Sequence, residues 1–205
     1  PSMFSNSKKI VSEFFANHVG KFLEIGANEL HLNHNDEPCS HLLEKGWYGL
    51  YCEPNPFSLV RLIEQTKDYN VDILCAAVNY KTGISKFKAS KSHAYLSSMD
   101  SVWMDFTLDL MPESLKNIPR DDHNIFINTV TPSEIFDKFG YDFDCISIDV
   151  ELPPWHTHQI LTQIDFDKVI AKMVVVETKF YSSDEYMRKF GFSINFDGPD
   201  TFYIR

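Results

Sequence analysis

Short apolar runs alternate with amphipathic stretches along the chain, and this alternation predicts strands and helices in turn. The runs at residues 22–27, 48–53, 73–78, 145–150 and 173–177 are nearly continuous in apolar residues. Such runs are typical of parallel strands that are buried on both faces. Between them, apolar residues recur at helical spacing and predict helices. The predicted helices are residues 7–18, 37–45, 57–66, 131–140, 157–164 and 184–190.

Residues that cap or break elements support these boundaries. Gly46 follows the second predicted helix, and Pro54 closes the second strand because proline cannot donate to a sheet. Thr131-Pro132-Ser133-Glu134 has the spacing of a capping box, with Thr131 as the N-cap. Near the end of the chain, the runs 192–196 and 201–204 flank Asp-Gly-Pro-Asp, which predicts a closing antiparallel hairpin.

These elements together predict one α/β domain over residues 1–205, with a mostly parallel sheet between two layers of helices. Residues 1–20 are expected to supply an N-terminal helix. Residues 80–132 are rich in Ser, Asp, Asn and Met, and contain one weak strand at 84–88. We expect this segment to be an irregular, acidic cover over the edge of the sheet.

Charge and composition exclude several classes of protein. The 205 residues are 43% hydrophobic and 23% charged, and 19 basic residues face 29 acidic ones, for a net charge of −10. Residues 100–151 alone hold 12 acids and 3 bases, which disfavours binding to a phosphate backbone. No apolar run approaches the roughly 18 residues that a membrane helix needs. We therefore expect neither a nucleic acid nor a membrane as partner; the pattern predicts nothing about oligomeric state.

The cysteines indicate a reducing environment. Cys39, Cys52, Cys75 and Cys145 show no C-x-x-C spacing, and three of them lie in predicted strands, so we expect reduced thiols in the core. The sequence begins with no signal peptide and contains no N-x-S/T acceptor. A cytoplasmic location is the simplest expectation.

Acidic residues stand at the ends of the predicted strands. Glu24 lies in the first strand, Glu53 ends the second, Asp149 and Glu151 end the fourth, and Glu177 ends the fifth. Open α/β sheets bind ligands where the carboxyl ends of strands meet their loops. We therefore expect these carboxylates along one rim of the sheet.

Gly26 and Glu53 have the spacing of a nucleotide-binding βαβ unit. Gly26 allows a backbone to approach a ligand closely, and a glutamate at the position of Glu53 can accept hydrogen bonds from ribose hydroxyls. The alternative is a packing glycine and a solvated acid, and the spacing alone does not decide between them. There is no phosphate-loop motif, and no Lys or Arg follows the first strand before Lys45. A nucleoside without phosphates, such as S-adenosylmethionine with its sulfonium, therefore suits the acidic rim better.

Several motifs, in order along residues 22–178, resemble those of the FkbM-type methyltransferases. The resemblance implies a Rossmann-like fold of the class I methyltransferase type, S-adenosylmethionine as cofactor, and methylation of hydroxyl oxygens in most members. The motifs are Phe22-Leu23-Glu24-Ile25-Gly26-Ala27-Asn28, Gly46-Trp47-Tyr48-Gly49-Leu50 leading to Glu53-Pro54-Asn55-Pro56, Ala76-Ala77-Val78, Thr131-Pro132-Ser133-Glu134-Ile135, Ile146-Ser147-Ile148-Asp149-Val150-Glu151 and Val174-Val175-Val176-Glu177.

The resemblance also implies roles for single residues. The turn after the first strand would hold the cofactor, Glu53 its ribose, and two small apolar residues its adenine, while Asp149 and Glu151 would face the transferred methyl. The expected cofactor site consists of Glu24, Gly26, Ala27, Asn28, Glu53, Pro54, Ala77, Val78 and Asp149.

Two departures from the family's pattern leave alternatives open. Leu30 stands where the family usually has the second glycine of its turn, and the residues 152–158 replace its Gly-x-Glu. The Pro-Pro-Trp in that segment resembles a motif of amino-methyltransferases, but a leucine precedes it and cannot accept from an amine. His156 and His158 could join Asp149 and Glu151 around a divalent metal, although His156 as a general base is preferred and no metal site is predicted.

We therefore expect an S-adenosylmethionine-dependent methyltransferase that transfers a methyl group to a hydroxyl of a small-molecule or glycan acceptor. Asp149, Glu151 and His156 are the expected catalytic residues. The alternative is a binding module that keeps the methyltransferase fold but has lost turnover.

Overall fold

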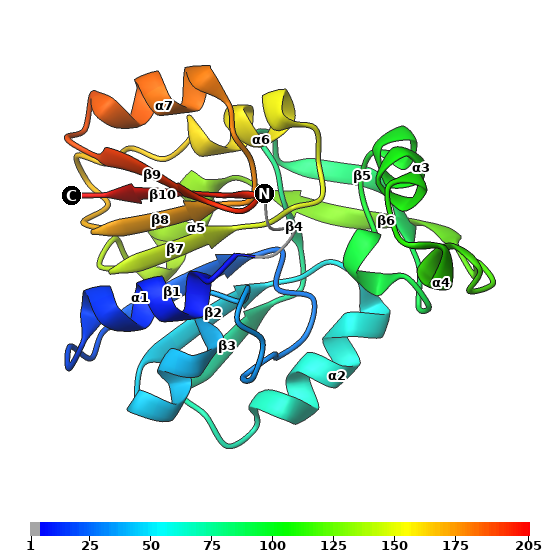
Figure 1. Ribbon diagram of the computed structural model, residues 1–205, viewed down its shortest axis with the longest axis horizontal. Helices are drawn as coiled ribbons and strands as arrows, with labels where there is room; N and C mark the ends of the chain where they lie inside the picture. Colours follow the sequence, from blue (N-terminus) through cyan, green and yellow to red (C-terminus); the bar gives the residue numbers. More distant parts are fainter. Residues whose placement is uncertain (1–4) are drawn as a thin grey trace.

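A seven-stranded sheet forms the centre of the computed structural model, which describes residues 5–205 (Figure 1). Its strand order is β3-β2-β1-β7-β8-β10-β9. The first five strands of that order are parallel to one another, whereas β10 runs antiparallel to both of its neighbours. The strands are β1 (Lys21–Ile25), β2 (Tyr48–Cys52), β3 (Val71–Leu74), β7 (Cys145–Ile148), β8 (Met173–Val176), β9 (Ser193–Asp197) and β10 (Asp200–Ile204).

Helices cover both faces of this sheet because its strands are apolar on both sides. In β1, Leu23 and Ile25 belong to one buried cluster and Phe22 to another, as the two-residue period of a strand requires. The first cluster is completed by α5 (Pro132–Phe139), α6 (Pro154–Leu161) and α7 (Tyr181–Arg188). The second is completed by α1 (Ser7–Phe15), the 3₁₀ helix η1 (Ser40–Lys45) and α2 (Pro56–Thr66). The predicted three-layer, Rossmann-like α/β sandwich with a C-terminal antiparallel hairpin is confirmed.

Local signals placed several boundaries correctly. The side chain of Thr131 accepts from the backbone of Glu134, and Glu134 accepts in return from the backbone of Thr131, so α5 begins with the predicted capping box. The Asn55 side chain accepts from Phe57 and caps α2. Gly46 adopts a left-handed conformation and ends η1, with its N–H directed to the carbonyls of the preceding turn.

Other predicted boundaries were wrong. The segment predicted as a helix over 37–45 forms only a 3₁₀ helix from residue 40. The Glu37 carboxylate accepts from the backbone N–H groups of Cys39 and Ser40, so a side chain, and not a helical turn from residue 37, satisfies these donors. The helix predicted over 7–18 ends at Phe15, where Ala16 takes a positive φ. The first four residues of the predicted 1–20 segment lie outside the described residues. The helices α6 and α7 each begin three residues before the predicted start.

The strand predicted over 73–78 is two strands in different sheets. It ends as β3 at Leu74, and β4 (Ala77–Val78) then pairs with β6 (His123–Val130) in a second sheet of order β4-β6-β5. The third member, β5 (Gly83–Ala89), is the predicted weak strand. A continuous apolar run does not reveal that its two ends have different pairing partners.

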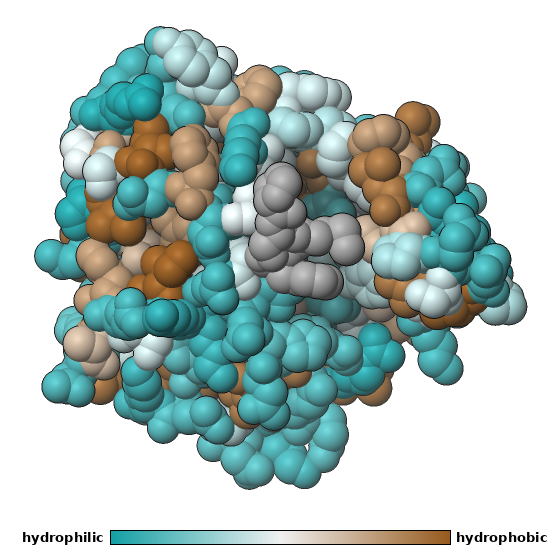
Figure 2. Space-filling view, in the orientation of Figure 1, coloured by the Kyte–Doolittle hydropathy of each residue, from teal (hydrophilic) through white to brown (hydrophobic). Residues whose placement is uncertain are grey.

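The segment 80–132 is therefore more regular than predicted. Besides β5 and β6, it contains η2 (Ala94–Leu96), α3 (Ser101–Asp109) and α4 (Glu113–Lys116). Strand β6 was missed because Phe126, whose side chain is 74% exposed, interrupts the alternation of apolar and polar residues. Figure 2 shows apolar side chains gathered over α3, where Val102, Phe106 and Leu110 are exposed one turn apart.

Three of the four cysteines are buried as free thiols, as expected, but Cys75 is exposed. It lies between β3 and β4, where the chain leaves the main sheet. The expectation that all four lie in the core was thus wrong for this residue. Among residues 5–205, no helix is both long enough and apolar enough to cross a membrane.

Candidate functional site

A cavity of about 450 Å³ opens at the carboxyl ends of β1, β2, β7 and β8. This volume lies within the range of small-molecule and cofactor sites. Its walls are the loops that follow these strands, together with residues 94–99 of the cover segment. The structure brings all of the predicted cofactor residues to this cavity, along with Glu151: Glu24, Gly26, Ala27, Asn28, Glu53, Pro54, Ala77, Val78 and Asp149.

Gly26 makes the close approach of two strand ends possible. Its φ is +81°, and a Cβ at this position would lie 1.6 Å from the carbonyl oxygen of Asp149. Its N–H donates to the carbonyl of Cys52 at 2.9 Å. The glycine is therefore a packing glycine between the ends of β1, β2 and β7, and it also lines the cavity.

Glu53 fastens the loop after β1 to the loop after β2. Its Oε2 accepts from the backbone N–H of Asn28 at 2.6 Å, and its Oε1 accepts from that of Asn55 at 2.7 Å. Burial raises the pKa of Glu53 to about 7, against the opposing effect of these two hydrogen bonds. Glu53 is 6% exposed and is thus no solvated strand-end acid. Each carboxylate oxygen retains a second lone pair for a ligand hydroxyl.

Beside Glu53, one wall of the cavity is small and apolar. Ala77 and Val78 form β4, and the side chains of Phe87 and Met99 reach the same wall from the cover segment. The Asn55 side chain donates to the carbonyl of Ser90 at 3.1 Å, which ties this wall to the cover segment. A flat aromatic ring that bound at this wall would make apolar contacts with it.

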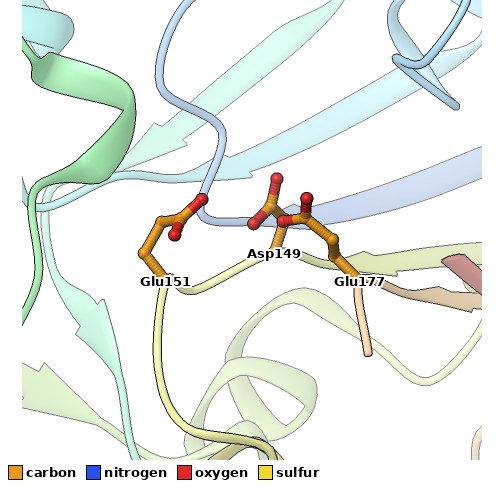
Figure 3. Close-up of side chains that lie close together, drawn as sticks. All are labelled: Asp149, Glu151 and Glu177. Atoms are coloured by element: carbon orange, nitrogen blue, oxygen red, sulfur yellow. The ribbon is translucent and has the colours of Figure 1, made fainter. Parts of the chain in front are cut away.

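The side chains of Asp149, Glu151 and Glu177 lie close together (Figure 3), and all three residues line the cavity. One carboxylate oxygen from each lies within 4.8 Å of the others. Burial raises the pKa of Asp149 to about 7, although a hydrogen bond from Glu177 opposes that rise. Burial and the charge of Glu177 raise the pKa of Glu151. Loss of water around the carboxylate and the charge of Asp149 raise the pKa of Glu177, although Glu177 as a whole residue is exposed. The predicted pair Asp149 and Glu151 is thus joined by a third carboxylate from the end of β8.

Further acids line the cavity beneath the loop after β1. Burial, and next the charge of Glu37, raise the pKa of Glu24, which is 6% exposed. Asp36 lies beside them, and Asp200 accepts from the hydroxyls of Ser5 and Ser7. No Lys or Arg within residues 5–205 lines the cavity. The cavity therefore suits a cationic or neutral ligand and repels a phosphorylated one.

Sequence reasoning missed Asp36, Glu37 and Asp200 as cavity residues. Asp36 and Glu37 lie in a polar stretch whose composition is that of an ordinary loop, and Asp200 lies in the predicted hairpin turn. Glu177 was visible as an acid at a strand end, and that position was the available signal for it.

The structure does not place His156 or His158 among the residues that line the cavity, so His156 is not brought together with Asp149 and Glu151. The Nε2 of His156 lies 2.9 Å from Oδ1 of Asn79, and Nδ1 of His158 lies 2.9 Å from the hydroxyl of Ser183. Because α6 begins at Pro154, both histidines lie on a helix, where residues two apart point to different sides, so they do not face one site together. The divalent-metal site that was considered for His156 and His158 together with Asp149 and Glu151 is likewise not formed.

Comparisons with known proteins show no family. No family model matches the chain, and no curated protein sequence matches it. Among solved structures, it is similar to the crystal structure of precorrin-6y C5,15-methyltransferase from Geobacter metallireducens GS-15, with 10% sequence identity and a TM-score of 0.47. That similarity covers 96% of this chain and 85% of the other. A likeness this distant carries no argument about activity, so the functional conclusion depends on the cavity itself.

Proposed function

We propose that this protein is an S-adenosylmethionine-dependent methyltransferase that methylates a hydroxyl oxygen of a small-molecule or sugar-like acceptor. The observation that carries the proposal is the position of Glu53 at the end of β2, in a cavity that small apolar residues and other carboxylates also line. The resemblance of its motifs to the FkbM-type methyltransferases supports the same assignment.

The cavity suits the two ends of this cofactor. Glu53 would accept from the ribose hydroxyls, and Ala77 and Val78 would contact the adenine. The sulfonium is positively charged, and it would lie toward Asp149, where carboxylates offset that charge. The absence of Lys and Arg from the lining within residues 5–205 agrees with a nucleoside ligand that carries no phosphates.

The bound cofactor would supply the methyl group, and the protein's own residues would orient the acceptor and take its proton. The His156 side chain contacts Asn79 and does not line the cavity. Of the three expected catalytic residues, Asp149 and Glu151 are therefore the ones that would contact the acceptor. The pKa of Asp149, raised to about 7, is suited to a general base at neutral pH. When bound, the cofactor would supply the methyl group and become a neutral thioether, and the Asp149 or Glu151 carboxylate would take the proton that the acceptor hydroxyl loses.

The same charges favour a neutral acceptor such as a glycan or metabolite over a nucleic acid or an acidic molecule. The cover segment borders the cavity through Tyr95 and Ser97, so it would contact the acceptor and help to select it.

Binding of the cofactor tests this proposal directly. We expect saturable binding of S-adenosylmethionine and S-adenosylhomocysteine by isothermal titration to protein washed free of ligand, in the presence of chelator. Replacing Glu53→Gln should weaken binding about tenfold, the equivalent of one hydrogen bond. The control Glu64→Gln changes an exposed glutamate on α2 that pairs with Lys67, and should leave affinity unchanged. Thermal melting of both variants shows whether they are folded.

The same titration, followed by an assay for methyl transfer, distinguishes the enzyme from a binding module without turnover. Leu30 in the turn and the position of His156 outside the cavity favour a binding module without turnover as the second candidate. Saturable binding with no methyl transfer to a panel of hydroxyl compounds would support that module. The absence of binding to the parent protein would contradict the enzyme.

A further inference from the structure

The three carboxylates of Asp149, Glu151 and Glu177 form a compact set of oxygen donors. Asp149 and Glu151 follow β7, and Glu177 follows β8, so two neighbouring strand ends hold them together (Figure 3). One oxygen from each lies within 4.8 Å of the others. When all three are ionised, like charges at this spacing repel one another unless a cation lies between them.

A second observation indicates a ligand at this position. Oδ1 of Asp149 is fully buried and has no hydrogen-bond partner among residues 5–205. On the neighbouring strand, Glu24 is 6% exposed, and its Oε2 also lacks a partner within the described part of the chain. Buried oxygens of this kind are rare in folded proteins and require an explanation such as a bound ion.

The described part of the chain offers no basic partner to these three carboxylates. The ion pairs within residues 5–205 include none to Asp149, Glu151 or Glu177. The nearby acid Glu29, by contrast, pairs with Arg61 at 2.6 Å. Asp149, Glu151 and Glu177 thus line the cavity without a counter-charge from residues 5–205.

We propose that Asp149, Glu151 and Glu177 bind a divalent cation of the Mg²⁺ or Mn²⁺ type. Carboxylate oxygens without nitrogen or sulfur donors suit these hard ions. A divalent ion also offsets more of the three negative charges than the single charge of an ammonium group does. Three protein oxygens leave coordination positions free for water or for an acceptor oxygen.

The cation also has a role that rests on the proposed function. With the ion bound, Asp149 would be a ligand and not the base, and an acceptor hydroxyl bound to the ion would have a lowered pKa and lose its proton more easily. The acceptors would then be compounds with an oxygen that can reach the cation, such as a vicinal diol. Binding of the ion itself does not depend on that role.

Titration with Mn²⁺ alone, followed by electron paramagnetic resonance of the free ion, tests the site without any cofactor. We expect one saturable site per chain from which Mg²⁺ displaces Mn²⁺. Replacing Glu177→Gln should weaken Mn²⁺ binding at least tenfold. Glu29→Gln, a change at another carboxylate that lines the same cavity, should leave Mn²⁺ affinity unchanged. Asp149→Asn gives a second variant of the site, and circular dichroism checks that each variant is folded.

The proposal is overturned if the parent protein shows no saturable Mn²⁺ binding, or if Glu177→Gln and Glu29→Gln bind it equally. Titration with S-adenosylmethionine in the presence of chelator is a separate measurement, and it tests the proposed methyltransferase without the cation. Mn²⁺ binding without cofactor binding would keep the cation site and refute the methyltransferase, and the reverse result would keep the methyltransferase alone.

Discussion

At the residue scale, Gly26 and Gly46 have nearly the same left-handed backbone but different surroundings. Their φ values are +81° and +86°; a Cβ on Gly26 would meet the Asp149 carbonyl at 1.6 Å, whereas a Cβ on Gly46 would have nothing within 4 Å. We expect Gly46→Ala to lower the free energy of unfolding by about 1 kcal/mol, the cost of the backbone conformation alone. Gly26→Ala should lower it by about 3 kcal/mol or more, because β1 and β7 must separate.

Urea denaturation of both variants at one pH measures this difference. Equal losses for the two glycines would show that the close approach to Asp149 contributes nothing to the cost. Gly26 and Gly46 also show what the sequence can and cannot predict about a single residue. A glycine after a strand indicates a close approach, but the group that approaches Gly26 follows a strand more than 100 residues later in the chain.

At the element scale, the start of α5 depends on a short, local set of hydrogen bonds. The side chains of Thr131 and Glu134 cap each other's backbone. Thr131→Ala removes one half of that exchange and should cost about 1 kcal/mol of stability. The control Ser133→Ala lies in the same first turn, and its hydroxyl makes only a 3.5 Å contact with the Gln163 carbonyl. A loss from Ser133→Ala as large as that from Thr131→Ala, measured by thermal melting, would contradict the role of the cap.

Elements whose signals are local were predictable from sequence. The helix α5, the cap of α2 and the hairpin of β9 and β10 each depend on residues a few positions apart. Strand β6 and the division between β3 and β4 were not predictable. Their hydrogen bonds depend on partners elsewhere in the chain, and Phe126 faces outward where an alternating pattern places a polar residue.

At the scale of the whole molecule, the buried acids of the cavity couple stability to pH. Burial raises the pKa of Glu53 from 4.5 to about 7, and it also raises that of Glu24. The folded state therefore binds more protons than the unfolded state between about pH 4.5 and 7, so the free energy of unfolding falls as pH rises through this window. For Glu53 alone, the loss is up to about 3 kcal/mol, and it is complete above pH 7.

Melting temperatures measured from pH 4.5 to 8 in chelator test this coupling. Glu53→Gln cannot titrate, so it should show a shallower fall than the parent protein. Carboxylates with a lowered pKa, such as Asp121, titrate below this window and do not contribute to it. A melting temperature that rises steadily from pH 5 to 8 would contradict the expected fall in stability.

The sequence by itself determined the class of fold, the positions of most strands and helices, and the gathering of acids at one rim of the sheet. Apolar runs, caps and strand-end positions are local properties, and parallel strands bring their carboxyl ends to one edge. Only the tertiary structure decided which of those acids bond to the backbone and which lie beside one another at the cavity. It joined Glu53 to the backbone of two loops, placed Glu177 beside Asp149, and turned His156 toward Asn79. These contacts depend on strand order and on where α6 begins, which are set by packing between segments distant in the chain.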